Sequence, residues 1–263
     1  MEIYFGLLNF EPLTALAVSS SRRPIPIEHW LRAAHECQPS TEIIPLPKGN
    51  VGIELVSIDD LSRLLAALSK SDKVAKVYLG HAPDTNPKLG WHRVTPFTCN
   101  NSSGFMACEC LQAGHFVKFR SATGYVNSIT RQHGMDYFGN FTKYDPPYKI
   151  RAATLSHEDA STCASWWNAR LPSIDELAAA LGTYDPKTPV KFTEGTNGHC
   201  VHASGIRWHE SVQEWSNDGS LIQHIVSKRD HSSHLRVWDA NIEDPEDRTQ
   251  TGLVATRLCW VGD

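Results

Sequence analysis

The chain has 263 residues, of which 41% are hydrophobic and 21% are charged, and this composition is sufficient for a folded core. Its formal net charge of -4 provides no broad basic surface, which argues against a nucleic-acid-binding protein and against adsorption to anionic membranes. No apolar run approaches the ~20 residues that a membrane-spanning helix needs, so we expect no membrane insertion.

The N-terminus and the cysteines predict the compartment. The first residues, MEIYFGLLNFEP, hold an acidic residue at position 2 and no basic stretch, which argues against a secretory signal peptide. The 7 cysteines are irregularly spaced and include no CxxC pair, a pattern typical of reduced, buried thiols. We therefore expect a protein that is synthesised in the cytoplasm without a signal peptide.

Residues 1–85 are predicted to form a small α/β domain. The apolar runs at 51–57 and 73–80 indicate strands, and the segment 57–69 between them carries leucines at helical spacing after a serine. A second helix is predicted at 26–37, where proline opens an apolar pattern. Turn-forming residues crowd the segment 81–90, so we place a linker at 86–94 and a second domain at 95–263.

The segment 156–182 predicts two short helices separated by a stiff corner. Ser156 has an acid three residues later, and Ser173 has Glu176 at the same spacing, so each serine can cap a helix start. Pro172 disfavours helical geometry at the residue before it, and Gly182 suits the left-handed residue that closes a helix. We expect one helix to end before Pro172 and another to run from Ser173 to Gly182.

Another helix is predicted at 114–125. Phe116, Phe119 and Ala122 recur on one face of this segment, and Gly124 is placed to end it. After Gly182 no helical period appears for some eighty residues, which predicts long irregular loops pinned by aromatic side chains.

The order of four motifs resembles the formylglycine-generating enzyme family. The motifs are ECLQAGHFVKFRSATGY (109–125), the double-helix segment (156–182), HESVQEWSNDG (209–219) and the closing LRVWDANIEDPEDRTQTGLVATRLC (235–259). Together they cover roughly residues 95–262. The resemblance implies an α+β domain of the C-type-lectin-like type with long irregular loops. It also implies that Trp166 or Trp167 and Leu177 pack against the sheet while Arg170 pairs locally.

The oxidase members of that family use two cysteines, five residues apart, that bind copper(I) as thiolates. The resemblance places those positions at Ser227 and Ser232, and no cysteine occurs between Cys200 and Cys259. A serine hydroxyl stays protonated at neutral pH and is a poor ligand for this soft ion. We therefore expect this chain to lack the oxidase activity.

A metal site remains open as an alternative. The stretch HCVHASGIRWHE supplies His199, His202 and His209, which could bind a transition metal. Later loops could add His224, His231 or His234. The resemblance also implies a structural Ca²⁺ near Asp218, whose oxygen ligands suit that ion. Apart from these two possibilities we expect no cofactor.

Two functions follow. The first is a non-catalytic ligand- or receptor-binding module, such as a phage tail or virion component, that binds a cell-surface protein or glycan through its loops. Residues 1–85 would attach it to other subunits of a larger assembly, and we expect a homo-oligomer. The alternative is a divergent non-haem metal-dependent oxidase that uses the three histidines of 199–209. The candidate binding surface would come from the loops around 186–210 and 227–250, and its residues are Trp208, His209, Arg229, His231, His234, Arg236 and Trp238.

Overall fold

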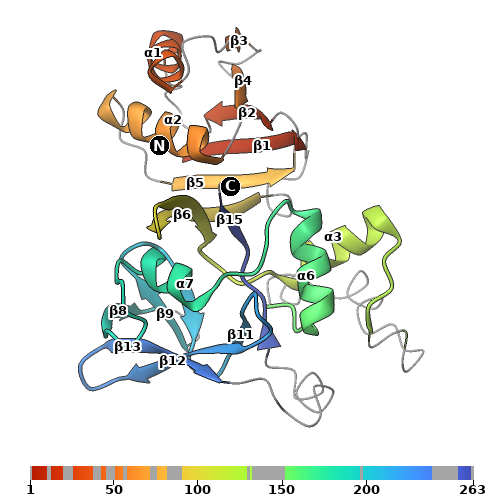
Figure 1. The fold of residues 1–263 in the computed structure, drawn as a ribbon, viewed down its shortest axis with the longest axis vertical. Coiled ribbons are helices and arrows are strands. Elements are labelled where there is room, and N and C mark those ends of the chain that lie inside the picture. Colours follow the sequence, from red (N-terminus) through yellow and green to blue (C-terminus); the bar gives the residue numbers. More distant parts are fainter. Residues whose placement is uncertain are drawn as a thin grey trace. The chain divides into compact units, whose positions relative to one another are not determined.

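The structure is a computed structural model that describes residues 2–10, 13–19, 26–37, 43–45, 51–55, 58–71, 76–81, 91–128, 131, 152–195, 198–238 and 254–261. These residues form helices and two β-sheets, so the fold belongs to the expected α+β class. The chain divides into two compact units, and most of their elements are labelled in Figure 1. Unit 1 contains Met1–Phe105 and Trp260–Asp263, and unit 2 contains Met106–Cys259.

Unit 1 is built on a mixed sheet. The strands are β1 (Glu2–Phe10), β2 (Leu13–Ser19), β3 (Ile43–Pro45), β4 (Val51–Leu55), β5 (Lys76–His81), β6 (Trp91–Cys99), β7 (Ser102–Ala107) and β15 (Cys259–Val261). Their order in the sheet is β15-β7-β6-β5-β1-β2-β4-β3. β1 is antiparallel to β2 and parallel to β5. A parallel pair needs a long crossover, which the chain between β2 and β5 supplies.

Two helices of unit 1 confirm the helices predicted near its start. They are α1 (Ile27–Cys37) and α2 (Ile58–Ser71), which pack against each other. On α2, the four leucines at helical spacing are all buried: Leu61, Leu64, Leu65 and Leu68. On α1, Trp30 and the two alanines that follow at positions 33 and 34 are buried as well. Their burial, more than helix propensity, stabilises these helices.

The boundary between the units lies beyond the predicted one. β6 begins at Trp91, inside the segment expected to be a linker, and pairs with β5 in an antiparallel ladder. Unit 1 therefore extends to Phe105 and includes Trp260 from the end of the chain. Gly104 permits this packing, because a Cβ there would lie 2.7 Å from the Phe97 ring and 2.8 Å from the Trp260 carbonyl oxygen. The turn residues before β6 could not reveal that the strand joins the same sheet.

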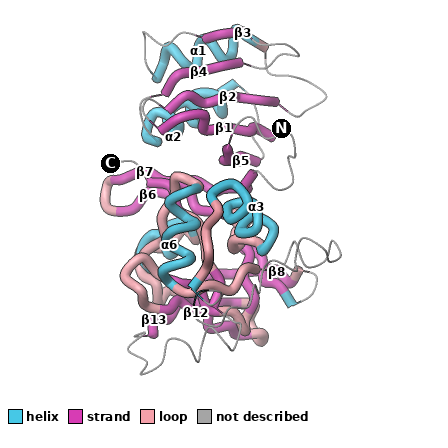
Figure 2. Tube along the Cα trace, turned by 90° about the vertical axis from the view of Figure 1, so that its right-hand side faces the viewer, coloured by secondary structure: helices cyan, strands magenta, loops and turns pink. Residues whose placement is uncertain are grey.

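The first helix of unit 2 is α3 (Ala113–Thr123), as predicted. Gly124 follows it with φ 71°, the left-handed geometry expected at a helix end. Phe116 and Phe119 are buried, whereas Ala122 is exposed, so the apolar face is narrower than predicted. α3 contacts α6 (His157–Trp166), and the two helices lie side by side in Figures 1 and 2.

The start of α6 differs in one detail from the expected capping box. The Ser156 hydroxyl accepts a hydrogen bond from the Asp159 amide, as predicted. The Asp159 carboxylate, however, accepts hydrogen bonds from the Tyr125 hydroxyl and from the amide and hydroxyl of Ser128. Asp159 therefore fixes the chain that follows α3, a role that the local sequence pattern could not show.

The corner between α6 and α7 (Ile174–Ala180) follows the prediction closely. The Ser173 hydroxyl accepts from the Glu176 amide at 3.2 Å, and the Glu176 carboxylate accepts from the Ser173 amide at 2.8 Å. Arg170 pairs with the same carboxylate, and Leu177 is fully buried. Gly182 has φ 75° after the helix. One carboxylate thus caps α7 and holds the Arg170 corner against it.

Removing the cap hydroxyl should weaken unit 2 measurably. We expect Ser173→Ala to lower the free energy of unfolding by about 1 kcal/mol, because one amide of α7 loses its partner. Denaturant unfolding monitored by tryptophan fluorescence measures the change. Ser165→Ala is the matched control, since its exposed hydroxyl bonds only to the Ser161 carbonyl within α6. Equal midpoints for the two variants would contradict the capping role.

Unit 2 contains the second sheet, which occupies the region after Gly182 where no helix was predicted. Its strands are β8 (Val190–Glu194), β9 (His199–His202), β10 (Arg207–His209), β11 (Gln213–Trp215), β12 (Leu221–Ser227), β13 (Ser232–Trp238) and β14 (Val254–Ala255). Their order is β10-β9-β8-β13-β12-β11-β14. The neighbours are antiparallel except for β11 and β14, which are parallel. Among the described residues, no helix combines the length and apolar character needed to cross a bilayer.

Candidate ligand-binding groove

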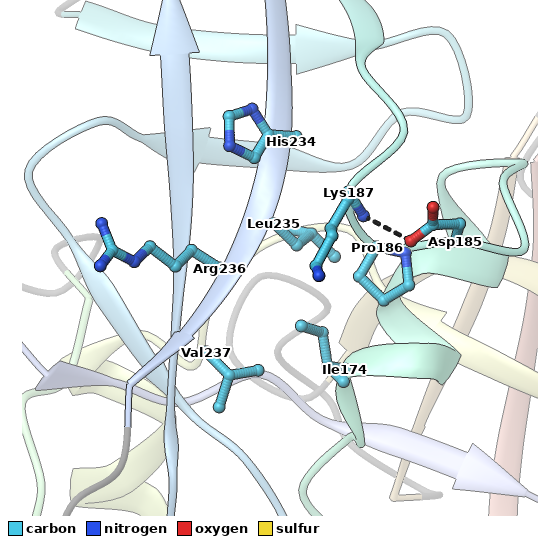
Figure 3. A pocket seen from close by; sticks show the side chains of 8 residues that line it. All are labelled: Ile174, Asp185, Pro186, Lys187, His234, Leu235, Arg236 and Val237. Atoms are coloured by element: carbon cyan, nitrogen blue, oxygen red, sulfur yellow. Dashed lines mark hydrogen bonds between the residues drawn. The ribbon is translucent and has the colours of Figure 1, made fainter.

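An open groove lies in unit 2 beside strand β13. Its cavity volume is about 610 Å³, within the ~300–1,000 Å³ common for ligand pockets. Three elements form it: the start of α7, the loop between α7 and β8, and β13 (Figure 3). The lining residues are Ile174, Asp185, Pro186, Lys187, His234, Leu235, Arg236 and Val237.

The loop 183–188 is held in shape by its own polar side chains. The Asp185 carboxylate accepts from the Lys187 amide at 2.9 Å, and the Thr183 hydroxyl donates to the Asp185 carbonyl at 3.1 Å. Such side-chain-to-backbone bonds are the usual stabilisers of turns that contain Asp and Thr. The Pro186 carbonyl then accepts from the Leu235 amide at 2.8 Å. The loop is therefore fixed to β13 on one side of the groove.

The two faces of β13 divide the lining side chains. Successive side chains of a strand point to opposite faces, so Leu235 and Val237 share one face while His234 and Arg236 share the other. Figure 3 shows the same division: Arg236 points away from Lys187, whose terminal nitrogen is directed toward the space beside Leu235. The inner wall of the groove is consequently apolar and carries one cation.

Exposed apolar side chains mark this part of the surface. Leu235 is buried, but Val237 is 40% exposed. Tyr184, which immediately precedes Asp185, is 97% exposed. In the part of the chain that the structure describes, the other large exposed apolar residues are Leu31 and Val126. Exposed aromatic and aliphatic side chains beside a groove are common anchors for a bound partner.

The predicted binding surface is only partly brought together. His234 and Arg236 border the groove, although their side chains lie on the opposite face of β13. Arg229 and His231 are exposed in the turn before β13, and His231 has φ 50°. Trp238 ends β13, but its side chain lies outside the described residues.

Trp208 does not belong to a binding surface. It is 2% exposed, and its ring stacks on that of buried His224 with a centroid separation of 4.3 Å. Residues of β9 and β10 alternate between two faces, and Trp208 pairs with buried Cys200 on the inner face. The prediction that Trp208 lies on the binding surface was wrong, because it rested on aromatic character alone. The strand register that turns Trp208 inward was not visible in the sequence.

The histidines of β9 and β10 are separated by the same alternation. His199 and His209 are direct cross-strand partners, with ring centroids 5.6 Å apart, whereas His202 lies three residues on and bonds to Ser204. The Ser211 amide donates to His209 Nδ1 at 3.2 Å. Burial, together with the nearby His209, lowers the pKa of His199. These three residues do not converge on one point.

Asp218 serves a local turn. Its carboxylate accepts from the amide and the hydroxyl of Ser220 at 2.9 Å and 2.7 Å, and these bonds lower its pKa. Within the described ranges, no three or more His, Cys, Asp or Glu side chains are grouped so as to hold a metal ion. The predicted set of His199, His202, His209 and Asp218 is therefore not assembled as one site.

Ser227 and Ser232 close the β12–β13 hairpin as direct cross-strand partners. The Ser232 hydroxyl donates to the Asp230 carboxylate at 2.9 Å, and hydrogen bonds from both serines lower the pKa of Asp230. Hydroxyl groups at these two positions thus stabilise a turn.

A buried ion pair lies at the centre of unit 2. Arg257 and Glu214 have side chains that are 0% and 2% exposed, and two hydrogen bonds of 2.7 Å join them. Burial alone would raise the pKa of Glu214, but the Arg257 guanidinium holds it below its ordinary value. Arg257 also donates to the carbonyls of Ala107 and Arg207. This pair joins two of the motifs that carry the family resemblance, and its contacts assign it to the core.

Ile174, Lys187 and Val237 of the groove, and Tyr184 before Asp185, were not named as site residues, although Lys187 and Val237 lie within the loops 186–210 and 227–250 of the predicted binding surface. Tyr184 and Lys187 lie in a stretch of the sequence, TYDPKTP, that reads as an ordinary turn. Ile174 and Val237 read as core positions of a helix and a strand. Only the proximity of α7 to β13, which are more than fifty residues apart in the chain, makes them neighbours. The available signals were the predicted surface loops and an aromatic residue in a turn.

No protein-family model matches this chain, and no curated protein or solved structure does so either.

Proposed function

We propose that this chain is a non-catalytic binding module that engages a partner protein through the groove between α7, the loop 183–188 and β13. The observation that carries the proposal is the combination of an open, mostly apolar groove with an exposed tyrosine, Tyr184, directly before the lining residue Asp185. Apolar walls suit the apolar side chains of a protein segment. The lectin-like scaffold and a role as a phage tail or virion component remain part of this proposal, on the strength of the sequence resemblance.

The fixed loop supports a binding role. Because Asp185 and Thr183 hold the loop and Pro186 accepts from β13, the groove is preformed, and little conformational entropy is lost when a ligand binds. In the same proposal, residues 1–85 attach the module to other subunits of a homo-oligomeric assembly.

Fragment mapping tests whether the groove binds ligands. The probe is a library of small carboxylates, amino-acid amides and monosaccharides, added to the ¹⁵N-labelled chain and followed by amide chemical shifts. We expect shifts to concentrate at Ile174, at 185–187 and at 235–237, because apolar grooves attract fragments of many kinds. Shifts centred on the 228–231 turn or on His199 and His209, or an absence of shifts, would overturn the proposal that ligands bind in the groove. If the monosaccharides caused larger shifts than the other fragments, the proposal that the partner is a protein would be overturned.

A matched pair of variants sharpens the same experiment. Val237→Glu places a charge in the groove and should abolish the shifts. Val126→Glu alters another exposed valine of unit 2, which is 46% exposed and is not a lining residue, and should preserve them.

The metal-dependent oxidase remains the alternative, and His199 and His209 are the two histidines in contact that favour it. Metal analysis of the purified chain separates the two functions. Stoichiometric copper or iron that is lost in the His202→Ala/His209→Ala variant would favour the oxidase, and a metal-free chain that binds fragments in the groove would favour the module.

A further inference from the structure

We propose that the groove accepts an extended segment of the partner protein, which bonds to the backbone of β13 at Val237, beyond the residues that β8 covers, and places an acidic side chain on Lys187. This inference rests on the binding function proposed above and names the chemistry of its ligand. The strand edge supplies main-chain hydrogen bonds, the apolar wall accepts a hydrophobic side chain, and the ammonium group selects an acid.

β13 lies between β12 and β8 in the sheet, but β8 covers only the first residues of β13. β8 pairs with β13 at Ser232 and Ser233, and the next bond along this edge runs from the Leu235 amide to Pro186. Backbone groups of alternate residues point to the same side of an antiparallel strand. The amide and carbonyl of Val237 therefore point to this side, away from β12. Among the described residues, no strand pairs with Val237 there.

An edge of this kind suits strand addition. An open edge offers unpaired N–H and C=O groups that another chain can bond, which is a recurrent mode of peptide recognition. Side chains of an added strand alternate between the two faces. One of them would lie over Val237 and Ile174, in the apolar wall of the groove.

The charge of the groove selects an acidic ligand. Lys187 is exposed, and in the described part of the chain no carboxylate lies within ion-pair distance of its ammonium group. Asp185, the acid among the lining residues, directs an oxygen to the Lys187 amide, and Figure 3 shows the ammonium group on the other side of Pro186, facing the groove. A carboxylate on the bound segment would provide the Lys187 ammonium group with an ion-pair partner.

Selection from a phage-displayed library of random 12-residue peptides on the full chain tests the inference. We expect enriched peptides to alternate apolar and acidic residues. Val237→Pro removes the outward amide without removing a bond to β12, and should weaken the enriched peptides about tenfold or more. Val237→Ile keeps the amide and should leave the affinity within about twofold. Lys187→Met keeps the stem and removes the charge, and should weaken acidic peptides by about tenfold.

The outcomes separate this inference from the proposed function. Peptides that bind in the groove, by amide shifts, but are insensitive to Val237→Pro would overturn strand addition and leave groove binding intact. If Lys187→Met left the affinity of the selected peptides unchanged, or if basic peptides were enriched, the inferred preference for an acidic ligand would be overturned. If free N-acetylglutamate bound as tightly as a selected peptide, the groove would be a site for small carboxylates. That result would overturn the inference that the ligand is a peptide segment. Peptides that bind only outside the groove would overturn both proposals.

Discussion

Replacing Arg257 with alanine is expected to lower the free energy of unfolding of unit 2 by about 3–5 kcal/mol. The substitution leaves the Glu214 carboxylate, 2% exposed, without its cation. It also removes the donors to the Ala107 and Arg207 carbonyls, at 2.8 Å and 2.7 Å. An uncompensated buried charge and two unpaired carbonyls are among the most costly defects in a core. Urea unfolding should show a lower midpoint at an unchanged slope.

A double variant identifies the cause. In Arg257→Met/Glu214→Leu no charge remains buried, so the loss should be clearly smaller than the sum of the losses for Arg257→Ala and Glu214→Ala. Additive losses, or an Arg257→Ala variant within about 1 kcal/mol of the unmodified chain, would contradict a structural role for the pair.

Acidification is expected to destabilise unit 2 through two buried histidines. Burial lowers the pKa of His224 to about 3 and that of His115 to about 4, from the ordinary value of 6.5. In the unfolded chain both histidines become protonated as the pH falls through 6.5, whereas in the folded chain they stay neutral. The free energy of unfolding therefore decreases as the pH drops below 6.5. Each histidine contributes about 1.4 kcal/mol per pH unit, which gives a loss of about 5 kcal/mol between pH 6.5 and pH 4.5.

The surroundings of the two rings explain the resistance to protonation. His224 lies on Trp208, and neither of its ring nitrogens has a hydrogen-bond partner among the described residues. The charged or titratable groups that act on it are Glu214, which favours protonation, and Arg257 and His202, which oppose it. His115 Nδ1 accepts from the Gln112 amide at the start of α3, and protonation would end that bond.

Urea unfolding at several pH values between 7 and 4.5 measures this dependence. His224→Leu should flatten the acid slope by about one proton, whereas Val126→Leu, at an exposed position of unit 2 without a titratable group, should leave it unchanged. A stability that is constant over this range, or an unaltered slope in His224→Leu, would contradict the assignment.

Local features of the fold were predictable because neighbouring residues determine them. The Ser173–Glu176 box and the glycines at 124 and 182 act within a single turn of chain, and the leucines of α2 follow one helical period. The strands after Gly182 are short and alternate imperfectly, so the sequence showed only an absence of helix. Trp208 was misplaced for that reason, since a one-residue change of register reverses the face of a side chain.

The candidate site was less predictable than the fold. His234 and Arg236 were chosen for their chemistry and do border the groove, but Lys187, Tyr184 and Val237 depend on a long-range contact between α7 and β13. The Lys187 ammonium group forms no ion pair with Asp185, because the Asp185 carboxylate accepts from a backbone amide instead. Residue spacing does not reveal this detail of turn geometry.

A crystal structure of the chain with a selected peptide tests the central claim most directly. The claim predicts an extended peptide beside β13, with main-chain hydrogen bonds to the Val237 amide and carbonyl and a carboxylate within 4 Å of Lys187 Nζ. A peptide bound at the 228–231 turn or beside His199 and His209, with the groove empty, would contradict it.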